Sequence, residues 1–237
     1  MRFIEGFEVI TLDESFVNGT GYRIPFAEPR KLVSLSGLLR LAEKHEPGPN
    51  PGFSREHAIL AFLTIGGAGT IGRESLAQQS GLGQGSVRTI LKRFRQEGFV
   101  KSDPFGCHLT ESGEALYQSI MKKMTPLVPI DGSPLSVGKS QVGISVRKKG
   151  KHVTNGISQR DSAIRAGATG ATSYLFEGNR FTIPGGSSDC EKDFPSKAWP
   201  ILRSKLNPKD GDAVIVCGAR EETIARLGAL SAALTLL

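Results

Sequence analysis

Basic and polar side chains gather between residues 84 and 95 of this 237-residue chain. Arginine donates paired hydrogen bonds to guanine and glutamine pairs similarly with adenine, while lysine and arginine also neutralise phosphates. Side chains suited to base edges come first, and candidates for phosphate contacts follow: Gln84, Ser86, Arg88 and Thr89, then Lys92, Arg93 and Arg95. This pattern is typical of a surface that binds nucleic acid.

An amphipathic helix entered at a glycine-rich turn and ended by Gly98 would position these side chains. Apolar residues recur at the spacing of one helix face: Val87, Ile90, Leu91 and Phe94. That face predicts packing on a core, and the opposite face is polar and basic. Because Gly85 carries no side chain where one would read a base, we expect a helix that holds the backbone and reads few bases.

The sequence on either side of this helix predicts a helix-turn-helix with a β-hairpin wing. A buried helix over residues 55–65 is capped by Ser54, and a second helix over 73–79 stops at a tight glycine turn. Residues 99–102 and 107–109 read as strands around a turn at 103–106, and Thr110 caps a further helix. Residues 54–125 are therefore expected to be a winged helix-turn-helix domain.

Further basic residues lie on these flanking elements. Arg73 stands near the start of the preceding helix, where free amides also favour an anion. Lys101 and His108 are placed on the wing, from which they would contact the backbone or the minor groove. We expect all three to contribute to binding of double-stranded DNA.

The sequences of several short segments resemble those of winged-helix transcription regulators. These segments are residues 70–73, 75–77, 81–83, 87–91, 97–100 and 109–113. Together with residues 161–171 and 214–219, the chain is similar to an archaeal group of uncharacterised regulators. In that group a winged helix precedes a C-terminal domain of unknown function, so the resemblance implies a DNA-binding regulator and brings no known ligand.

The rest of the chain predicts a second domain. A proline-rich segment marks a linker over residues 126–140, and residues 1–53 form an extension with a leading helix at 32–44. Over residues 141–237 the element order β-α-β-β-α-β-α predicts a small α/β sandwich that senses a ligand or mediates oligomerisation. The fold class is therefore α+β or α/β, with an N-terminal winged helix-turn-helix.

Several residues of the second domain are candidates for binding a small-molecule effector. They are Arg160, Asp161 and Arg165, the loop glycines Gly185 and Gly186, and Gly218 with Arg220 before the last helix. An Asp161–Arg165 ion pair would explain two of them equally well. The basic run at 147–151 is either a phosphate patch or a solvated loop.

Composition limits the remaining possibilities. The net charge of +7 and a pI near 9.5 favour a polyanionic partner, although solubility explains them equally well. Three observations favour the cytoplasm. The cysteines (Cys107, Cys190 and Cys217) are dispersed, the N-terminus lacks a signal peptide, and the C-terminal apolar run is too short to span a bilayer. We recognise no catalytic motif, cofactor loop or metal cluster, and we expect none of these functions.

The function that these patterns favour is a sequence-specific DNA-binding transcription regulator that acts as a homodimer under a small-molecule effector. The closing helix, apolar nearly all round, is either covered by its own domain or buried between subunits. Two alternatives stay open. In the first, the C-terminal domain is an enzyme that the winged helix docks or regulates. In the second, the basic helix face is only solvated, and the chain is a protein-interaction module.

Overall fold

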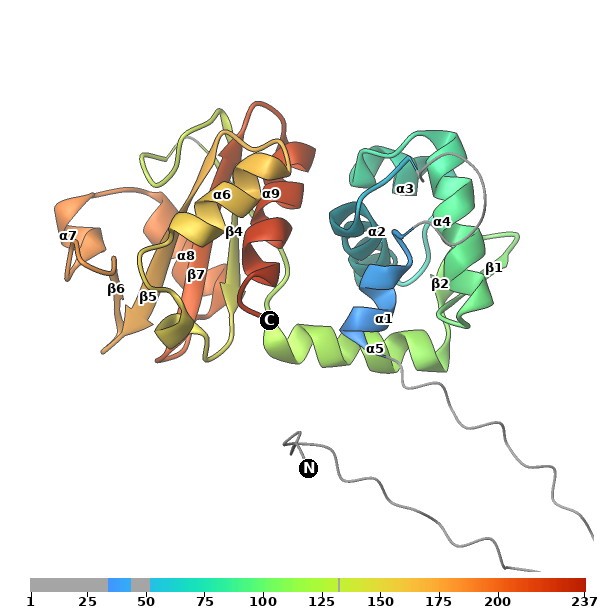
Figure 1. Cartoon of the computed structure of the whole chain (residues 1–237), viewed down its shortest axis with the longest axis horizontal. Coiled ribbons are helices and arrows are strands. Elements are labelled where there is room, and N and C mark those ends of the chain that lie inside the picture. Colours follow the sequence, from blue (N-terminus) through green and yellow to red (C-terminus); the bar gives the residue numbers. More distant parts are fainter. Residues whose placement is uncertain (1–33, 44–51, 132) are drawn as a thin grey trace, which may run out of the picture. The chain divides into compact units, whose positions relative to one another are not determined.

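The computed structural model describes residues 34–43, 52–131 and 133–237 (Figure 1). Much of the extension expected before residue 54 lies outside these residues. The described residues belong to one compact unit. No helix in the described parts of the chain is long and apolar enough to cross a membrane.

The first half of the described chain is helical, with a single hairpin. The helices are α1 (Leu35–Arg40), α2 (Arg55–Ala68), α3 (Arg73–Ser80), α4 (Gln84–Gln96) and α5 (Glu111–Lys123), and β1 (Val100–Asp103) and β2 (Gly106–Leu109) precede α5. Their apolar faces share one core, in which the Phe62 ring meets those of Phe94 and Phe99 edge to face. The element order from α2 to α5 is the expected one.

Local capping explains where α2 and α5 begin. The Ser54 hydroxyl accepts from the amide of His57, and Thr110 accepts from that of Gly113 at 3.1 Å. At its other end α2 continues beyond the expected residue 65, through Gly66 and Gly67 to Ala68. A Cβ at Gly66 would lie 2.4 Å from the Tyr117 ring, so the glycine lets α5 pack directly on the α2 backbone.

The turn between α3 and α4 needs a left-handed residue. Gly81 supplies it with a φ of 69°, and the next amide, that of Leu82, donates to the Ala77 carbonyl at 3.1 Å. Leu82 is buried, and Gly83 then leads into α4. This geometry fixes the direction in which α4 leaves the core.

The second half is built on a five-stranded sheet in the order β3-β4-β7-β5-β6. The strands are β3 (Val128–Asp131), β4 (Ser140–Val146), β5 (Gly170–Glu177), β6 (Arg180–Thr182) and β7 (Asp212–Ala219). Every neighbouring pair is antiparallel. The second half thus combines helices with an antiparallel sheet, in which β7 lies between β4 and β5.

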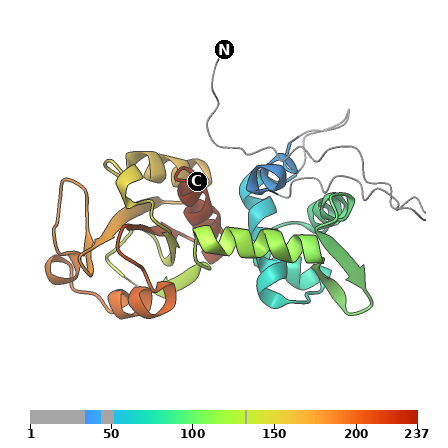
Figure 2. The same ribbon diagram turned by 90° about the horizontal axis from the view of Figure 1, so that it is seen from below.

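Helices cover both faces of this sheet. Helices α6 (Ile157–Arg165) and α9 (Glu222–Leu234) pack on one face, and α8 (Ala198–Leu206) packs on the other, as Figure 2 shows from below. A 3-10 turn (Gly150–His152) and the short α7 (Cys190–Asp193) complete the chain. Because β7 is covered on both sides, each of its residues is buried.

The segment expected to be a linker contains an edge strand. Pro129 lies in β3 opposite Val142 of β4. Proline lacks an amide hydrogen and is therefore tolerated in a sheet chiefly at an edge. The proline-rich composition of residues 126–134 thus marks the border of the sheet.

Helix α9 is covered by its own chain. It contacts α6, β4 and β7, and also α2. Its Ser231 hydroxyl donates to the Glu56 carboxylate of α2 at 3.2 Å. Of the two explanations for its apolar character, burial within the chain is the one that the structure supports.

Candidate nucleic-acid interface

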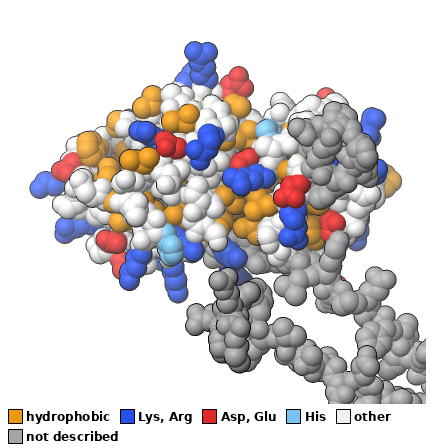
Figure 3. All heavy atoms as spheres, in the orientation of Figure 1, with side chains coloured by type: hydrophobic (Ala, Val, Ile, Leu, Met, Phe, Trp, Pro, Cys, Tyr) orange, Lys and Arg blue, Asp and Glu red, His pale blue; other side chains and the backbone are white. Residues whose placement is uncertain are grey.

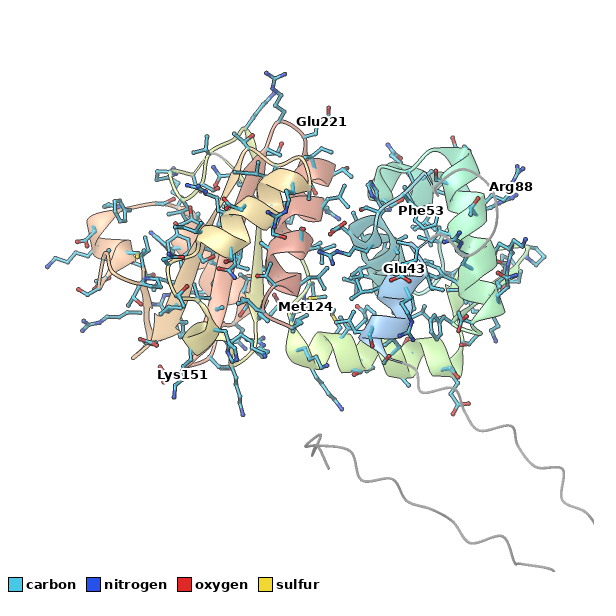
Figure 4. All side chains as sticks on the ribbon, in the orientation of Figure 1. Glu43, Phe53, Arg88, Met124, Lys151 and Glu221 are labelled. Atoms are coloured by element: carbon cyan, nitrogen blue, oxygen red, sulfur yellow. The ribbon has the colours of Figure 1, made fainter. Side chains whose placement is uncertain are left out.

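Helix α4 divides into a buried face and an exposed face as its spacing predicts. Val87, Ile90, Leu91 and Phe94 are buried, whereas Arg88, Thr89, Lys92 and Arg95 are exposed. Figure 4 shows the Arg88 side chain pointing outward from α4. The helix has no acidic residue in its first turn, and its last turn is basic.

A groove of about 310 Å³ runs between α4 and the hairpin. Three arginines line it, Arg73 from α3 and Arg88 and Arg95 from α4. The hairpin supplies the opposite wall, including Ser102 and Phe105. The fold therefore brings together guanidinium groups from two helices that are separate in sequence.

Asp103 is the acidic residue in this groove, and its carboxylate is occupied within the hairpin. Its Oδ1 accepts from the amides of Phe105 at 2.8 Å and Gly106 at 3.1 Å, and its Oδ2 lies 3.5 Å from His108 Nδ1. Within the described residues, no carboxylate forms an ion pair with Arg73, Arg88 or Arg95. The groove thus holds positive charge that no carboxylate of the described residues neutralises by direct pairing.

The termini of the two helices add to this polarity. Gly72 precedes α3 and Gly83 precedes α4, and neither start has a side-chain cap. The first amides of α4, whose first turn has no acidic residue, favour an anion, whereas Glu74 in the first turn of α3 offsets this effect there. Gln84 is exposed at the start of α4 beside these amides.

Arg93 is engaged elsewhere. Its guanidinium donates to the carbonyl of Leu41 and, at 2.9 Å, to that of Glu43, and it lies 5.5 Å from the centre of the Phe53 ring. Figure 4 labels Glu43 and Phe53 on the side of α4 away from Arg88. The structure therefore gives Arg93 a structural role that our phosphate assignment did not foresee: it holds the C-terminal end of α1.

Two other candidate side chains form hydrogen bonds with backbone carbonyls. Ser86 donates to the Gly52 carbonyl at 3.1 Å, and Thr89 donates to the Gly85 carbonyl at 3.0 Å. Both hydroxyl oxygens can still accept a hydrogen bond. Their positions on the exposed side of α4 follow the expected helix phase.

The hairpin carries two of the predicted residues opposite each other. Lys101 pairs with His108 across the strands, so both side chains lie on one face. Lys101 is exposed, whereas Nδ1 of His108 is buried without a hydrogen-bond partner among the described residues. At the tip of the hairpin, the Phe105 side chain is 87% exposed. Phe105 is not among the residues predicted to bind DNA, although the Asp-Pro-Phe-Gly turn signal predicts its place at the tip.

Cys107 anchors the hairpin and is not a reactive thiol. Its backbone pairs with Ile71 just before α3, and its Sγ donates to the Ile71 carbonyl at 3.1 Å. Burial raises the pKa of the thiol, and the nearby Arg95 and Arg73 offset only part of this rise. The groove is therefore closed at its base by a neutral, buried side chain.

The candidate ligand residues of the second half do not converge on one site. Gly185 and Gly186 form a tight turn, and a Cβ at Gly218 would lie 2.3 Å from the Val137 carbonyl oxygen, so Gly218 admits the chain's own loop. Arg220 is exposed, and α9 begins with Glu221 and Glu222, whose charges disfavour an anion there. None of the grooves described here is lined by these glycines or by Arg220.

The ion pair at the start of α6 joins Asp161 to Arg160, and not to Arg165 as one explanation of these residues expected. Asp161 lies 3.4 Å from Arg160, its neighbour, and Arg165 has no ion pair within the described chain. The basic run at 147–151 is partly structural, because Arg147 donates to the buried Asp212 at 2.6 Å and to the Asn207 carbonyl at 3.1 Å. In the face shown by Figure 3, basic side chains are interspersed with acidic and hydrophobic ones.

Groups of histidine, cysteine, aspartate or glutamate that could hold a metal ion do not occur in the described part of the chain. The arrangement that remains is the arginine-lined groove. Its chemistry is recognition of an anion by guanidinium groups next to helix amides.

Comparisons with known proteins identify one family match and one similar solved structure. A comparison with curated proteins gives no match. Residues 137–236 match the family described as "Domain of unknown function (DUF4443)". Among solved structures, a hypothetical protein from Pyrococcus horikoshii OT3 is similar, with a TM-score of 0.63 and 22% identity over 78% of this chain and 92% of the other. The chain thus shares its fold with an archaeal protein, and its residues 137–236 are similar to the DUF4443 family.

Proposed function

We propose that this protein is a winged helix-turn-helix regulator that binds double-stranded DNA through α4 and the β1–β2 hairpin. The observation that carries the proposal is the groove lined by Arg73, Arg88 and Arg95, none of which pairs with a carboxylate of the described residues. Helix α4 presents side chains of the size and polarity that enter a major groove, and the hairpin supplies the wing. The resemblance of residues 70–113 to winged-helix transcription regulators agrees with this function.

Within this proposal the side chains have different tasks. Arg88, near the N-terminal part of α4, contacts a base edge together with Gln84, and Arg73, Arg95 and Lys92 contact phosphates. Lys101 and the exposed Phe105 bring the hairpin against the neighbouring groove. Arg93 has no part in the contact surface, because α1 occupies its guanidinium.

The test is a fluorescence-anisotropy titration of labelled duplexes, one from the protein's own promoter region and one of random sequence. We expect binding that weakens steeply with salt, and Arg88→Ala with Lys92→Ala is expected to weaken it by about a hundredfold. The matched control is Arg180→Ala, at an exposed arginine of β6. If neither duplex showed salt-dependent binding, or the double variant matched the control, the proposal would fail.

A further inference from the structure

A second groove, of about 480 Å³, lies at the contact of α2, α5 and α9. Its wall is mainly apolar, from Leu60, Leu63, Met121, Pro126 and Leu127, with the Tyr117 ring beside them. Most of these side chains are only partly buried, so a ligand would remove apolar surface from water. The volume falls within the range of roughly 300 to 1,000 Å³ that is usual for small-molecule sites.

The walls of this groove are fixed by packing and backbone hydrogen bonds. The Tyr117 ring lies against the α2 backbone at Gly66, where no side chain fits. The chain after α5 is tied to the sheet, because the Thr125 amide donates to the Ser145 carbonyl at 2.9 Å and Met124 bridges to Val146. A site formed in advance binds a ligand without the entropy cost of ordering a loop.

The polar groups around the groove indicate the charge of its ligand. Arg226 of α9 is the charged side chain in the lining, and Thr64 and Gln79 are its polar neighbours. Arg226 pairs with Glu222 one turn earlier, but both contacts, at 2.8 and 2.6 Å, go to one carboxylate oxygen. Because a guanidinium has five N–H donors, it retains donors for a second anion.

We propose that this groove binds a small carboxylic acid with an apolar body, whose carboxylate pairs with Arg226 while its body lies against Leu63, Met121 and Tyr117. Charge complementarity argues for an anion, since the lining holds a cation and no carboxylate. The apolar wall argues for a hydrocarbon body. This binding does not depend on the proposed DNA contact, although an effect of the ligand on DNA affinity would rest on that function.

The experiment uses the full chain without DNA, so its outcome is independent of the DNA test. We would titrate 4-phenylbutyrate and its neutral amide, following heat by calorimetry and the NMR signals of the Gly67 backbone amide and the Gln79 side-chain amide. The carboxylate is expected to bind saturably and about tenfold more tightly than the amide. Saturable shifts at both probes of the groove are expected with the carboxylate.

Two variants assign that preference to Arg226. Arg226→Gln is expected to abolish the preference for the carboxylate, and Glu222→Gln, which removes the competing carboxylate, is expected to strengthen carboxylate binding severalfold. Arg180→Gln serves as the matched control and is expected to change neither affinity. The Glu222 variant also keeps the test decisive if Arg226→Gln fails to fold. Equal affinity for acid and amide, shifts confined to other residues, or a Glu222→Gln affinity equal to the wild type would each overturn the proposal.

Discussion

The arginines beside α4 and those beside the sheet differ in what their guanidinium groups meet. Arg147 donates to the buried Asp212, and Arg203 donates to Glu191 while stacking 5.3 Å from the centre of the Phe176 ring. Arg73, Arg88 and Arg95 instead line a groove without an ion-pair partner in the described chain. The same residue type therefore stabilises one region and leaves charge available in the other.

The comparison also shows why charge counts are a weak guide to a binding site. The basic run at 147–151 contains more positive charge than any equally short stretch of α4, yet Arg147 is used to satisfy Asp212 and the carbonyls that end α8. A basic residue is therefore a better candidate for ligand contact when internal acceptors leave some of its N–H donors free.

The largest effect is expected where a carboxylate holds an arginine internally. Asp212 is 1% exposed and accepts from Arg147 and from the amides of Lys148 and Lys209. Asp212→Ala would leave these donors unpartnered and is expected to lower the free energy of unfolding by about 3 to 5 kcal/mol. Urea denaturation followed by circular dichroism measures this change.

The matched control for that variant is Asp161→Ala, because Asp161 forms an exposed pair with Arg160. Its expected effect is below about 0.5 kcal/mol. Equal stability of the two variants would contradict the structural role that we assign to Asp212.

A smaller loss of stability is expected at Arg93, the arginine of α4 whose guanidinium is bound within the chain. Its replacement by alanine removes hydrogen bonds to α1 and the stacking on Phe53, so we expect the unfolding free energy to fall by about 1 to 2 kcal/mol. Its neighbour Lys92, which is exposed, is the control for stability. A stable Arg93→Ala protein with a weakened salt dependence of DNA binding would place Arg93 in the interface instead.

The smallest effect concerns a carboxylate at the contact of α2 and α9. Burial raises the pKa of Glu56, but hydrogen bonds from the Ser54 and Arg55 side chains outweigh it, and the net pKa lies below the usual 4.5. A lowered pKa in the folded state means stability that is present above pH 4.5 and is lost as the pH falls through the folded pKa. The free energy of unfolding, measured between about pH 3 and 6, the range in which carboxylates titrate, should fall less steeply with acid in Glu56→Gln than in the wild type. An unchanged pH profile would show that other groups cause the acid dependence.

Local features of the sequence predicted most of the elements. Ser54 and Thr110 cap their helices as expected, and the spacing of Val87, Ile90, Leu91 and Phe94 gives the correct buried face of α4. Capping and periodicity depend on neighbours within a few residues, which a single sequence contains.

Features that depend on distant partners were missed. The continuous apolar run of β7 is equally compatible with a buried parallel strand and with the centre of an antiparallel sheet, so topology remained undetermined. Pro129 made the strand β3 unrecognisable from sequence. The role of Arg93 depends on the carbonyls of Leu41 and Glu43, which follow α1 in a distant segment. The scattered glycines Gly186 and Gly218 serve a turn and a close backbone approach, which composition alone does not distinguish from a ligand loop.

The most direct measurement of the central claim is the salt dependence of duplex binding for the variant in which Arg73, Arg88 and Arg95 are all replaced by alanine. If Arg73 and Arg95 bind DNA phosphates and Arg88 contacts a base edge, the affinity should fall, and the slope of log affinity against log salt concentration should become shallower by about one for each phosphate contact that is lost. The Arg180→Ala control should keep the wild-type slope and affinity. A triple variant that folds normally and retains both would contradict the account.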